Sequence, residues 1–88
     1  MNIEEIKQLI AVDKLEEAEN ELTRLLEQEE SEAAYLLRAG IYRKREQFGD
    51  ALNDYLSAEE INPAGVARQY IDQINEILDF YNTEMYNV

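Results

Sequence analysis

The sequence predicts an all-α fold made of antiparallel helical hairpins that stack side by side. Only one proline and three glycines occur in 88 residues, so few positions interrupt a helix. Apolar residues recur at spacings of three and four, which is the period of a helix with one buried face. The apolar pattern of the first half also returns in the second half at a constant offset, as in proteins built from stacked helical units. We therefore expect five helices.

The first two expected helices form one hairpin. The first covers about residues 2–12, and its apolar positions are Ile3, Ile6, Leu9 and Ile10. The second is expected to run to about Glu29, with Asp13 as its N-cap and Glu16 three residues later, the spacing of a capping box. Its expected buried stripe is Leu15, Ala18, Leu22, Leu25 and Leu26.

The remaining three helices follow from the same signals. Ser31 is a candidate cap for a third helix that runs to about Glu46, and a fourth covers 48–61. Pro63 is a helix-start signal, because proline at the first helical position lacks only an amide that would have no partner, and this fifth helix runs to about Asn82. The apolar positions are Tyr35, Ala39 and Tyr42 in the third helix, Phe48, Ala51, Leu52, Tyr55 and Ala58 in the fourth, and Tyr70, Ile71, Ile74, Ile77, Leu78 and Tyr81 in the fifth.

Six pairs of apolar residues carry the internal repeat. They are Ile6 with Ala39, Leu9 with Tyr42, Leu15 with Phe48, Ala18 with Ala51, Leu22 with Tyr55, and Leu25 with Ala58. The offset is 33 in every pair, which indicates two helical hairpins of the same design.

Nine positions of segment 32–63 match a known repeat pattern. They are Tyr35, Ala39, Tyr42, Phe48, Ala51, Leu52, Tyr55, Ala58 and Pro63. With these residues the segment resembles a tetratricopeptide repeat (TPR), a pair of antiparallel helices. The resemblance implies a right-handed superhelical stack in which the matched residues pack the repeats, with small residues where backbones approach. Arg38, Glu46 and Glu59 depart from the family, which has a leucine, a turn glycine and an apolar residue there.

The resemblance also implies the domain organisation. We expect one TPR-like domain, 1–82, with a first repeat at about 2–30, a second at about 31–63 and a capping helix at about 63–82. A tail without helix signals follows at 83–88. This tail is apolar enough to pack on the capping helix, to lie in the protein's own groove or to insert into a second copy.

A partner-binding groove is the functional expectation that the resemblance carries. In TPR folds the first helix of each hairpin lines a concave groove, and the last helix completes it. The corresponding positions here are Lys7, Leu36, Leu37, Gly40, Arg43, Lys44, Ile71, Asn75 and Leu78. These residues suit a peptide with apolar anchors and an acidic group. The alternative is that the apolar candidates Leu36, Leu37, Ile71 and Leu78 pack between helices.

Charge is unevenly distributed along the chain. Residues 1–32 carry a net charge of −8, residues 33–47 carry +3 and residues 48–88 carry −7. The basic band consists of Arg38, Arg43, Lys44 and Arg45. It is interpreted either as a strip that recognises an anion or as internal balance for acidic side chains of neighbouring helices.

Composition disfavours several classes of function. A net charge of −12 repels phosphate backbones and anionic lipids, so neither nucleic acid nor a membrane is an expected partner. The chain has no histidine and no cysteine, and we expect no enzyme, no metal and no cofactor. We expect a cytoplasmic protein, without an export signal. The leading hypothesis is a module that binds a peptide or protein, and the alternative is a structural unit that self-associates through its helix ends or its tail.

Overall fold

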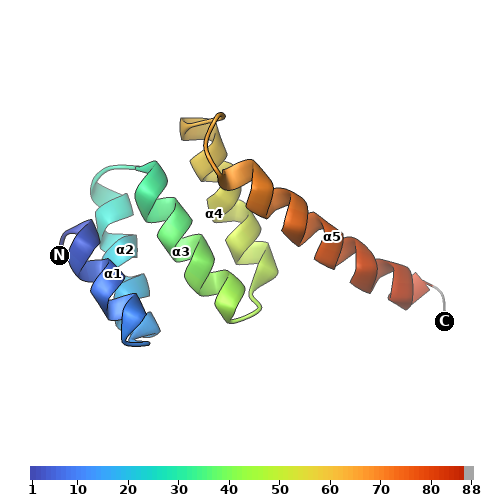
Figure 1. The fold of residues 1–88 in the computed structure, drawn as a ribbon, viewed down its shortest axis with the longest axis horizontal. Coiled ribbons are helices and arrows are strands. Elements are labelled where there is room, and N and C mark those ends of the chain that lie inside the picture. The colour runs from blue at the N-terminus through green and yellow to red at the C-terminus, as the bar shows by residue number, and fades with distance from the viewer. Residues whose placement is uncertain (87–88) are drawn as a thin grey trace.

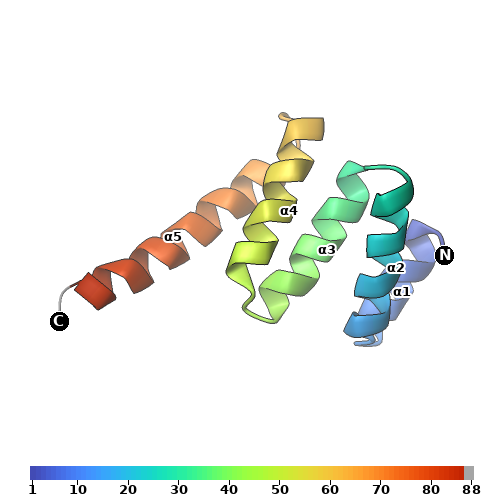
Figure 2. The ribbon, with the colours of Figure 1, turned by 180° about the vertical axis from the view of Figure 1, so that it is seen from behind.

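A computed structural model describes the backbone of residues 1–86 and the side chains of residues 1–80. This part of the chain is all-α. Its five helices are α1 (Ile3–Ala11), α2 (Leu15–Gln28), α3 (Glu32–Lys44), α4 (Phe48–Ile61) and α5 (Ala67–Tyr86). The helices lie side by side in chain order in an elongated molecule of 47 × 28 × 19 Å (Figure 1). Helix α1 is nearer the viewer in Figure 1, whereas α2 and α4 are nearer in the reverse view of Figure 2.

Side chains cap two of the helices. Asn2 and Glu5 form a capping box at the start of α1, where the Glu5 amide donates to Asn2 Oδ1 at 2.8 Å and the Asn2 amide donates to Glu5 Oε1 at 3.1 Å. The expected cap of α3 is confirmed, because the Ala34 amide donates to Ser31 Oγ at 3.1 Å. Each cap satisfies an amide that has no partner inside its helix.

The turns that follow α1 and α3 have the same shape, a Schellman motif. Asp13 and Glu46 occupy its left-handed position, with φ of 65° and 61°. In each turn the next amide reaches back to a carbonyl of the last helical turn, Lys14 to Leu9 at 2.9 Å and Gln47 to Tyr42 at 2.8 Å. This position normally takes glycine, because a side chain is strained there.

These turns correct two expectations from the sequence. Asp13 is not the N-cap of α2 and forms no capping box with Glu16, since Lys14 is the N-cap and offers no side-chain bond. The third helix ends at Lys44 instead of Glu46. In both cases the backbone hydrogen bonds that end the preceding helix include Asp13 or Glu46 in the turn. These bonds outweigh the residue's local preference for a helix.

The internal repeat extends to the helix ends. The same offset that relates the six apolar pairs separates Ala11 from Lys44, the last residues of α1 and α3, and it also separates both ends of α2 from those of α4. Burial repeats as well, and both partners are buried in three of the six pairs, namely Ile6 with Ala39, Ala18 with Ala51, and Leu22 with Tyr55. The hairpins α1–α2 and α3–α4 therefore share one backbone plan.

Two apolar clusters form the core, and α3 contributes to both. The first contains Ile6, Ala18, Leu22, Ala34 and Ile41. The second contains Ala39, Ala51, Tyr55, Ala58, Ala67, Ile71 and Ile74. Tyr35, Tyr42 and Phe48 are partly buried and pack against the second cluster. The expected apolar stripe of α3 did not include Ala34 and Ile41, which belong to the first cluster. A central helix buries two faces, whereas the sequence pattern predicted one.

Helix α5 differs from the expectation at both ends. It begins at Ala67, and Pro63 is exposed in the preceding loop, outside both core clusters. Proline is common just after a helix end, and Pro63 follows Asn62, the C-cap of α4. The helix continues to Tyr86, so the prediction of a non-helical tail is wrong for residues 83–86, while 87 and 88 lie outside the described residues. No glycine or proline follows Gly65 to stop the helix.

No helix among the described residues combines the length and the apolar character needed to cross a bilayer.

Candidate functional site

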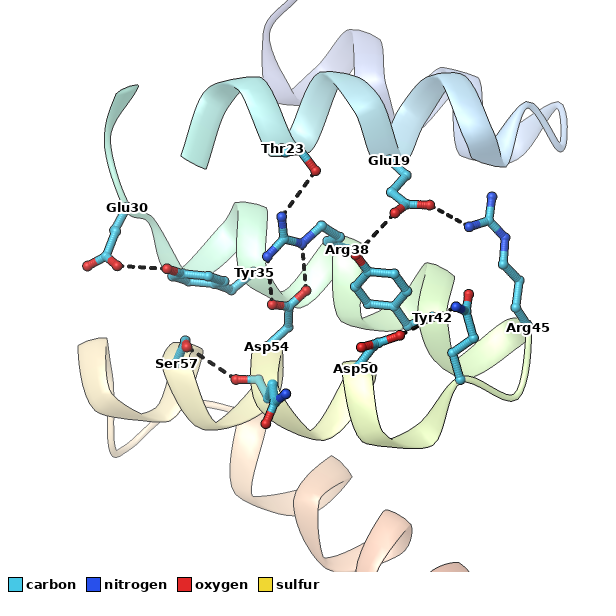
Figure 3. A network of polar contacts seen from close by, with 12 residues as sticks. Glu19, Thr23, Glu30, Tyr35, Arg38, Tyr42, Arg45, Asp50, Asp54 and Ser57 are labelled. Atoms are coloured by element: carbon cyan, nitrogen blue, oxygen red, sulfur yellow. Dashed lines mark hydrogen bonds and ion pairs between the residues drawn. The ribbon is translucent and has the colours of Figure 1, made fainter. Parts of the chain in front are cut away.

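A polar network centred on Arg38 joins α2, α3 and α4. Its guanidinium donates to both carboxylate oxygens of Asp54, Nε to Oδ2 at 2.7 Å and Nη2 to Oδ1 at 2.8 Å, and Nη1 donates to Thr23 Oγ1 at 3.1 Å. Figure 3 shows Arg38 between these two side chains. The Asp54 side chain is only 7% exposed. The hydrogen bond to Asp54 raises the pKa of Arg38 above its ordinary value, so the guanidinium stays charged and its two bonds to Asp54 join α3 to α4.

Two tyrosines of α3 also donate hydrogen bonds to carboxylates. Tyr42 Oη donates to Glu19 Oε2 at 3.1 Å, and Tyr35 Oη donates to Glu30 Oε1 at 2.7 Å (Figure 3). Burial and then the bond to Glu19 raise the pKa of Tyr42, whereas the bond to Glu30 is the main cause of the raised pKa of Tyr35. Both phenols are held in the neutral form, which is the form that donates.

Three of the four bases in the basic band bind carboxylates of the chain itself. Arg38 pairs with Asp54, Lys44 Nζ lies 3.4 Å from Asp13 Oδ1, and Arg45 donates to Glu19. These contacts favour internal balance as the interpretation for three of the four. Arg43 differs, because it forms no ion pair with any described residue.

Arg43 is held by an aromatic stack instead. Its guanidinium carbon lies 4.9 Å from the centre of the Tyr70 ring. Tyr70 in turn stacks on Tyr55, with ring centres 4.9 Å apart and planes 12° from parallel. Tyr55 is 2% exposed, and its burial raises its pKa, an effect that the Arg43 charge opposes. An exposed cation from α3 is thus anchored on a buried ring of α4 through a ring of α5.

Open space lies beside this cation. Gly40 precedes Arg43 by three residues on α3 and so shares its side of the helix. A Cβ atom placed on Gly40 would meet nothing within 4 Å, and the position is partly exposed. A partner's backbone can therefore approach α3 next to Arg43.

The apolar groove candidates mainly pack between helices. Ile71 is 1% exposed and belongs to the second core cluster, so its assignment to the groove surface is wrong. Leu36 and Leu78 pack against the same cluster, and Leu37 packs against the first, each while partly exposed. Helical spacing identifies an apolar face, but whether a partner or a neighbouring helix covers it depends on the packing.

The polar groove candidates remain on the surface. Lys7, Lys44 and Asn75 are exposed. Lys7 Nζ lies 3.3 Å from Glu4 Oε1, a pair within α1 that is exposed to solvent and weak. Of the nine candidates, Arg43 is thus the base that is held in place by a ring and pairs with none of the carboxylates that the structure describes.

Two important contacts join residues that lie far apart in the sequence. Tyr70 was expected only as an apolar position of the fifth helix, and no pattern in the sequence marks Asp54 among the many carboxylates. The contact of Asp54 with Arg38 spans a long stretch of chain, and Tyr70 lies still further along the chain from Arg43. No local spacing signals contacts at such separations. Within the described residues, no three acidic side chains are arranged to hold a metal ion.

Comparison with known proteins gives one clear similarity. The solution NMR structure of the Bacteroides fragilis protein BF1650 matches this structure with a TM-score of 0.82 and 39% sequence identity. The match covers 98% of this chain and 89% of that one. No protein-family model and no curated protein matches the chain.

Proposed function

The chain belongs to the same family as the Bacteroides fragilis protein BF1650, and from its own contacts we propose a non-enzymatic interaction module that binds a carboxylate-bearing peptide or partner protein. The binding surface is the face of α1, α3 and α5 that contains Arg43. The observation that carries the proposal is the stack of Arg43 on Tyr70 at 4.9 Å without any carboxylate among the described residues.

The stack makes Arg43 suitable for binding. A guanidinium that is already held on an aromatic ring loses little conformational freedom when a ligand arrives. Its planar donors match a carboxylate in a bidentate arrangement. The open space at Gly40 admits the ligand backbone, and Lys44, although paired with Asp13, adds positive potential on the same helix.

We also propose that the two hairpins and α5 form a right-handed superhelical array of the TPR type, with α5 as its cap. The constant offset between equivalent helix ends and turns supports this assignment. So does the burial of small residues, since Ala39, Ala51 and Ala58 are 0% exposed and small buried residues allow neighbouring helices to approach closely. In such an array α1, α3 and α5 would line the concave face, and Arg43 of α3 would belong to it.

Selected peptides test the proposal. Short peptides displayed with free carboxyl termini are selected on the protein, and their affinities are measured by fluorescence anisotropy. Arg43→Gln is expected to weaken binding about tenfold or more, because a charged hydrogen-bonding partner is lost. The control is Arg24→Gln, the same change at an exposed arginine of α2 that pairs with Glu21 at 2.9 Å.

Amide replacement of each ligand carboxylate completes this test. At one carboxylate, the amide replacement is expected to weaken binding to the wild type as much as Arg43→Gln does. The same replacement should not weaken binding to the Arg43→Gln variant any further. Equal affinities for the wild type and Arg43→Gln would refute the carboxylate site. A stable dimer in light scattering that binds none of the selected peptides would favour the structural, self-associating unit instead.

A further inference from the structure

The last helix presents a second surface that the carboxylate site does not use. Helix α5 packs on the core through Ala67, Ile71, Ile74 and Leu78. Another side of the helix has an open depression of about 540 Å³, lined by Gln73, Glu76, Ile77 and Phe80. These four residues follow the i, i+3, i+4, i+7 spacing of a single helix face. We call them, together with Asp79, the α5 face.

The centre of the α5 face is apolar. Ile77 is partly exposed and Phe80 is 60% exposed. Large apolar side chains gathered on one side of a helix and bordered by polar groups are typical of protein-binding surfaces. Figure 1 shows that the C-terminal end of α5 extends away from the other four helices, so a partner can reach this side.

The border of the α5 face is acidic. After Arg68, the described side chains of α5 include Asp72, Glu76 and Asp79 and no base. Asp72 lies 3.4 Å from Arg68. Glu76 and Asp79 form no ion pair with any residue whose side chain the structure describes.

We propose that the α5 face is a docking site for a basic amphipathic helix of a partner protein. The apolar side of that helix would cover Ile77 and Phe80, and its flanking lysines or arginines would pair with Glu76 and Asp79. Charge complementarity selects this occupant. A second copy of the chain carries a net charge of −12 and would bring like charges together, as nucleic acid or an anionic membrane would.

This proposal goes beyond the carboxylate site, because the two surfaces take ligands of opposite charge. Arg43 lies on α3 and contacts Tyr70 near the start of α5, whereas Glu76 and Asp79 lie further along the helix. Removing the charge of Arg43 is therefore expected to leave the basic helix bound.

The test uses two defined probes, an amphipathic helical peptide of leucine and lysine and the same peptide with glutamate in place of lysine. Binding to the full chain is measured by fluorescence anisotropy, and NMR shifts of the backbone amides locate the site. We expect the lysine peptide to bind and to shift α5 amides around 73–80, and the glutamate peptide not to bind. Binding of both peptides alike, or shifts spread over all five helices, would overturn the proposal.

Matched variants separate this site from a general attraction to an acidic protein. The double variant Glu76→Lys, Asp79→Lys is expected to weaken lysine-peptide binding about tenfold or more, because two close charge pairs become repulsive. The double variant Glu16→Lys, Glu17→Lys changes the net charge equally, at exposed positions of α2, and should weaken it less than about threefold, since distant charges are screened by salt. Equal effects of the two variants would refute the α5 face.

The apolar contribution has its own control. Phe80→Ser is expected to weaken binding about fivefold or more, because a large apolar contact is lost. Leu56→Ser changes another exposed apolar residue, 43% exposed on α4, and should leave the affinity unchanged. Circular dichroism verifies that both variants keep their helices. If Arg43→Gln still binds the lysine peptide, the α5 face binds its ligand without the carboxylate site.

Discussion

The two hairpins have the same backbone plan but bury different side chains at equivalent positions. Their helices end at equivalent positions of the repeat, and their turns have nearly equal φ at Asp13 and Glu46. The first hairpin buries Ile6 and Leu22, whereas the second buries Ala39 and Tyr55 at the equivalent positions. A larger residue in one helix accompanies a smaller one in the other, so the hairpin geometry depends on the combined volume more than on the individual side chains.

The second hairpin also has two neighbours, whereas the first has one. Arg38 connects it to α2 through Thr23, and Tyr55 connects it to α5 through Tyr70. The equivalents of Arg38 and Asp54 in the first hairpin are Glu5 and Glu21, which lie near the surface. The second hairpin therefore has polar and aromatic side chains at the positions where it joins neighbours on both sides.

The largest expected effect comes from breaking the buried ion pair of the second hairpin. Asp54→Asn should lower the free energy of unfolding by about 3 kcal/mol, because the partly buried guanidinium of Arg38 loses the counter-charge of the buried Asp54. Glu21→Gln, the equivalent change in the first hairpin, should cost less than about 0.5 kcal/mol, since Glu21 pairs with the exposed Arg24 and, at 3.9 Å, with the chain's N-terminal ammonium, and such surface pairs are weak. Urea denaturation followed by circular dichroism measures both.

A double variant separates the cost of leaving Arg38 without its partner from the net stability that the Arg38–Asp54 pair contributes. Arg38→Leu with Asp54→Leu places apolar residues at both positions and should recover most of the stability lost in Asp54→Asn. A double variant less stable than Asp54→Asn would show that the pair itself is the main stabilising element.

The next effect tests volume exchange between the hairpins. Ala39→Ile overpacks the second core, and Tyr55→Leu leaves a cavity and removes the stack on Tyr70, so each should cost about 2 kcal/mol. Together they reproduce the first hairpin's Ile6 and Leu22 and should cost at least about 1 kcal/mol less than the sum. The same urea titrations complete the cycle, and additive losses would contradict the compensation.

A smaller effect of opposite sign is expected in the turns. Glu46→Gly should raise the free energy of unfolding by about 0.5–1 kcal/mol, because glycine adopts the left-handed conformation without strain. Asp13→Gly should gain less, since aspartate tolerates this conformation better than glutamate, and it also loses the weak contact with Lys44. Thermal unfolding of both variants gives the order, and a loss of stability in Glu46→Gly would contradict the strain.

The smallest effect is a sensitivity to alkaline pH in the second hairpin. The raised pKa values of Tyr35, Tyr42 and Tyr55 mean that the folded state keeps its phenol protons when the unfolded state loses them. Their contribution to stability is complete below about pH 10, the unfolded pKa, and is lost as the pH rises through the folded pKa. Tyr55→Phe should reduce this loss.

Urea titrations at neutral and alkaline pH measure the alkaline effect. The first hairpin has no tyrosine, since Tyr35 is the first in the chain, and its variant Leu22→Ala should therefore show the same pH dependence as the wild type. A pH dependence unchanged by Tyr55→Phe would remove the buried phenol as its source.

Much of the fold was predictable because its signals are local. The bounds of α4 and the Ser31 cap match the expectation, and so does the spacing of the repeat in the helix ends. The failures occur where two local preferences compete. Asp13 is suitable both as an N-cap and in a left-handed turn. It adopts the turn because carbonyls of the preceding helix accept hydrogen bonds from the amides of Asp13 and Lys14. Pro63 suits a helix start, but here it follows a helix end.

The candidate site was less predictable. The basic band was visible as four charges within eight positions, but their fates differ. Arg38 is partly buried and pairs with Asp54, Lys44 and Arg45 pair with carboxylates of the first hairpin, and Arg43 contacts the Tyr70 ring. Neighbouring residues on a helix point in different directions, so each meets a different helix.

Local sequence signals specify that this chain folds into helices, where most of these helices begin and end, and that two hairpins repeat. Helical hydrogen bonds and caps join residues at most a few positions apart, so composition and spacing specify them. Packing between helices specifies which bases are paired with carboxylates, that Ile71 is in the core, and that Tyr70 contacts Arg43. Those outcomes depend on how far one helix is shifted and rotated against the next, which side-chain packing over the whole molecule sets.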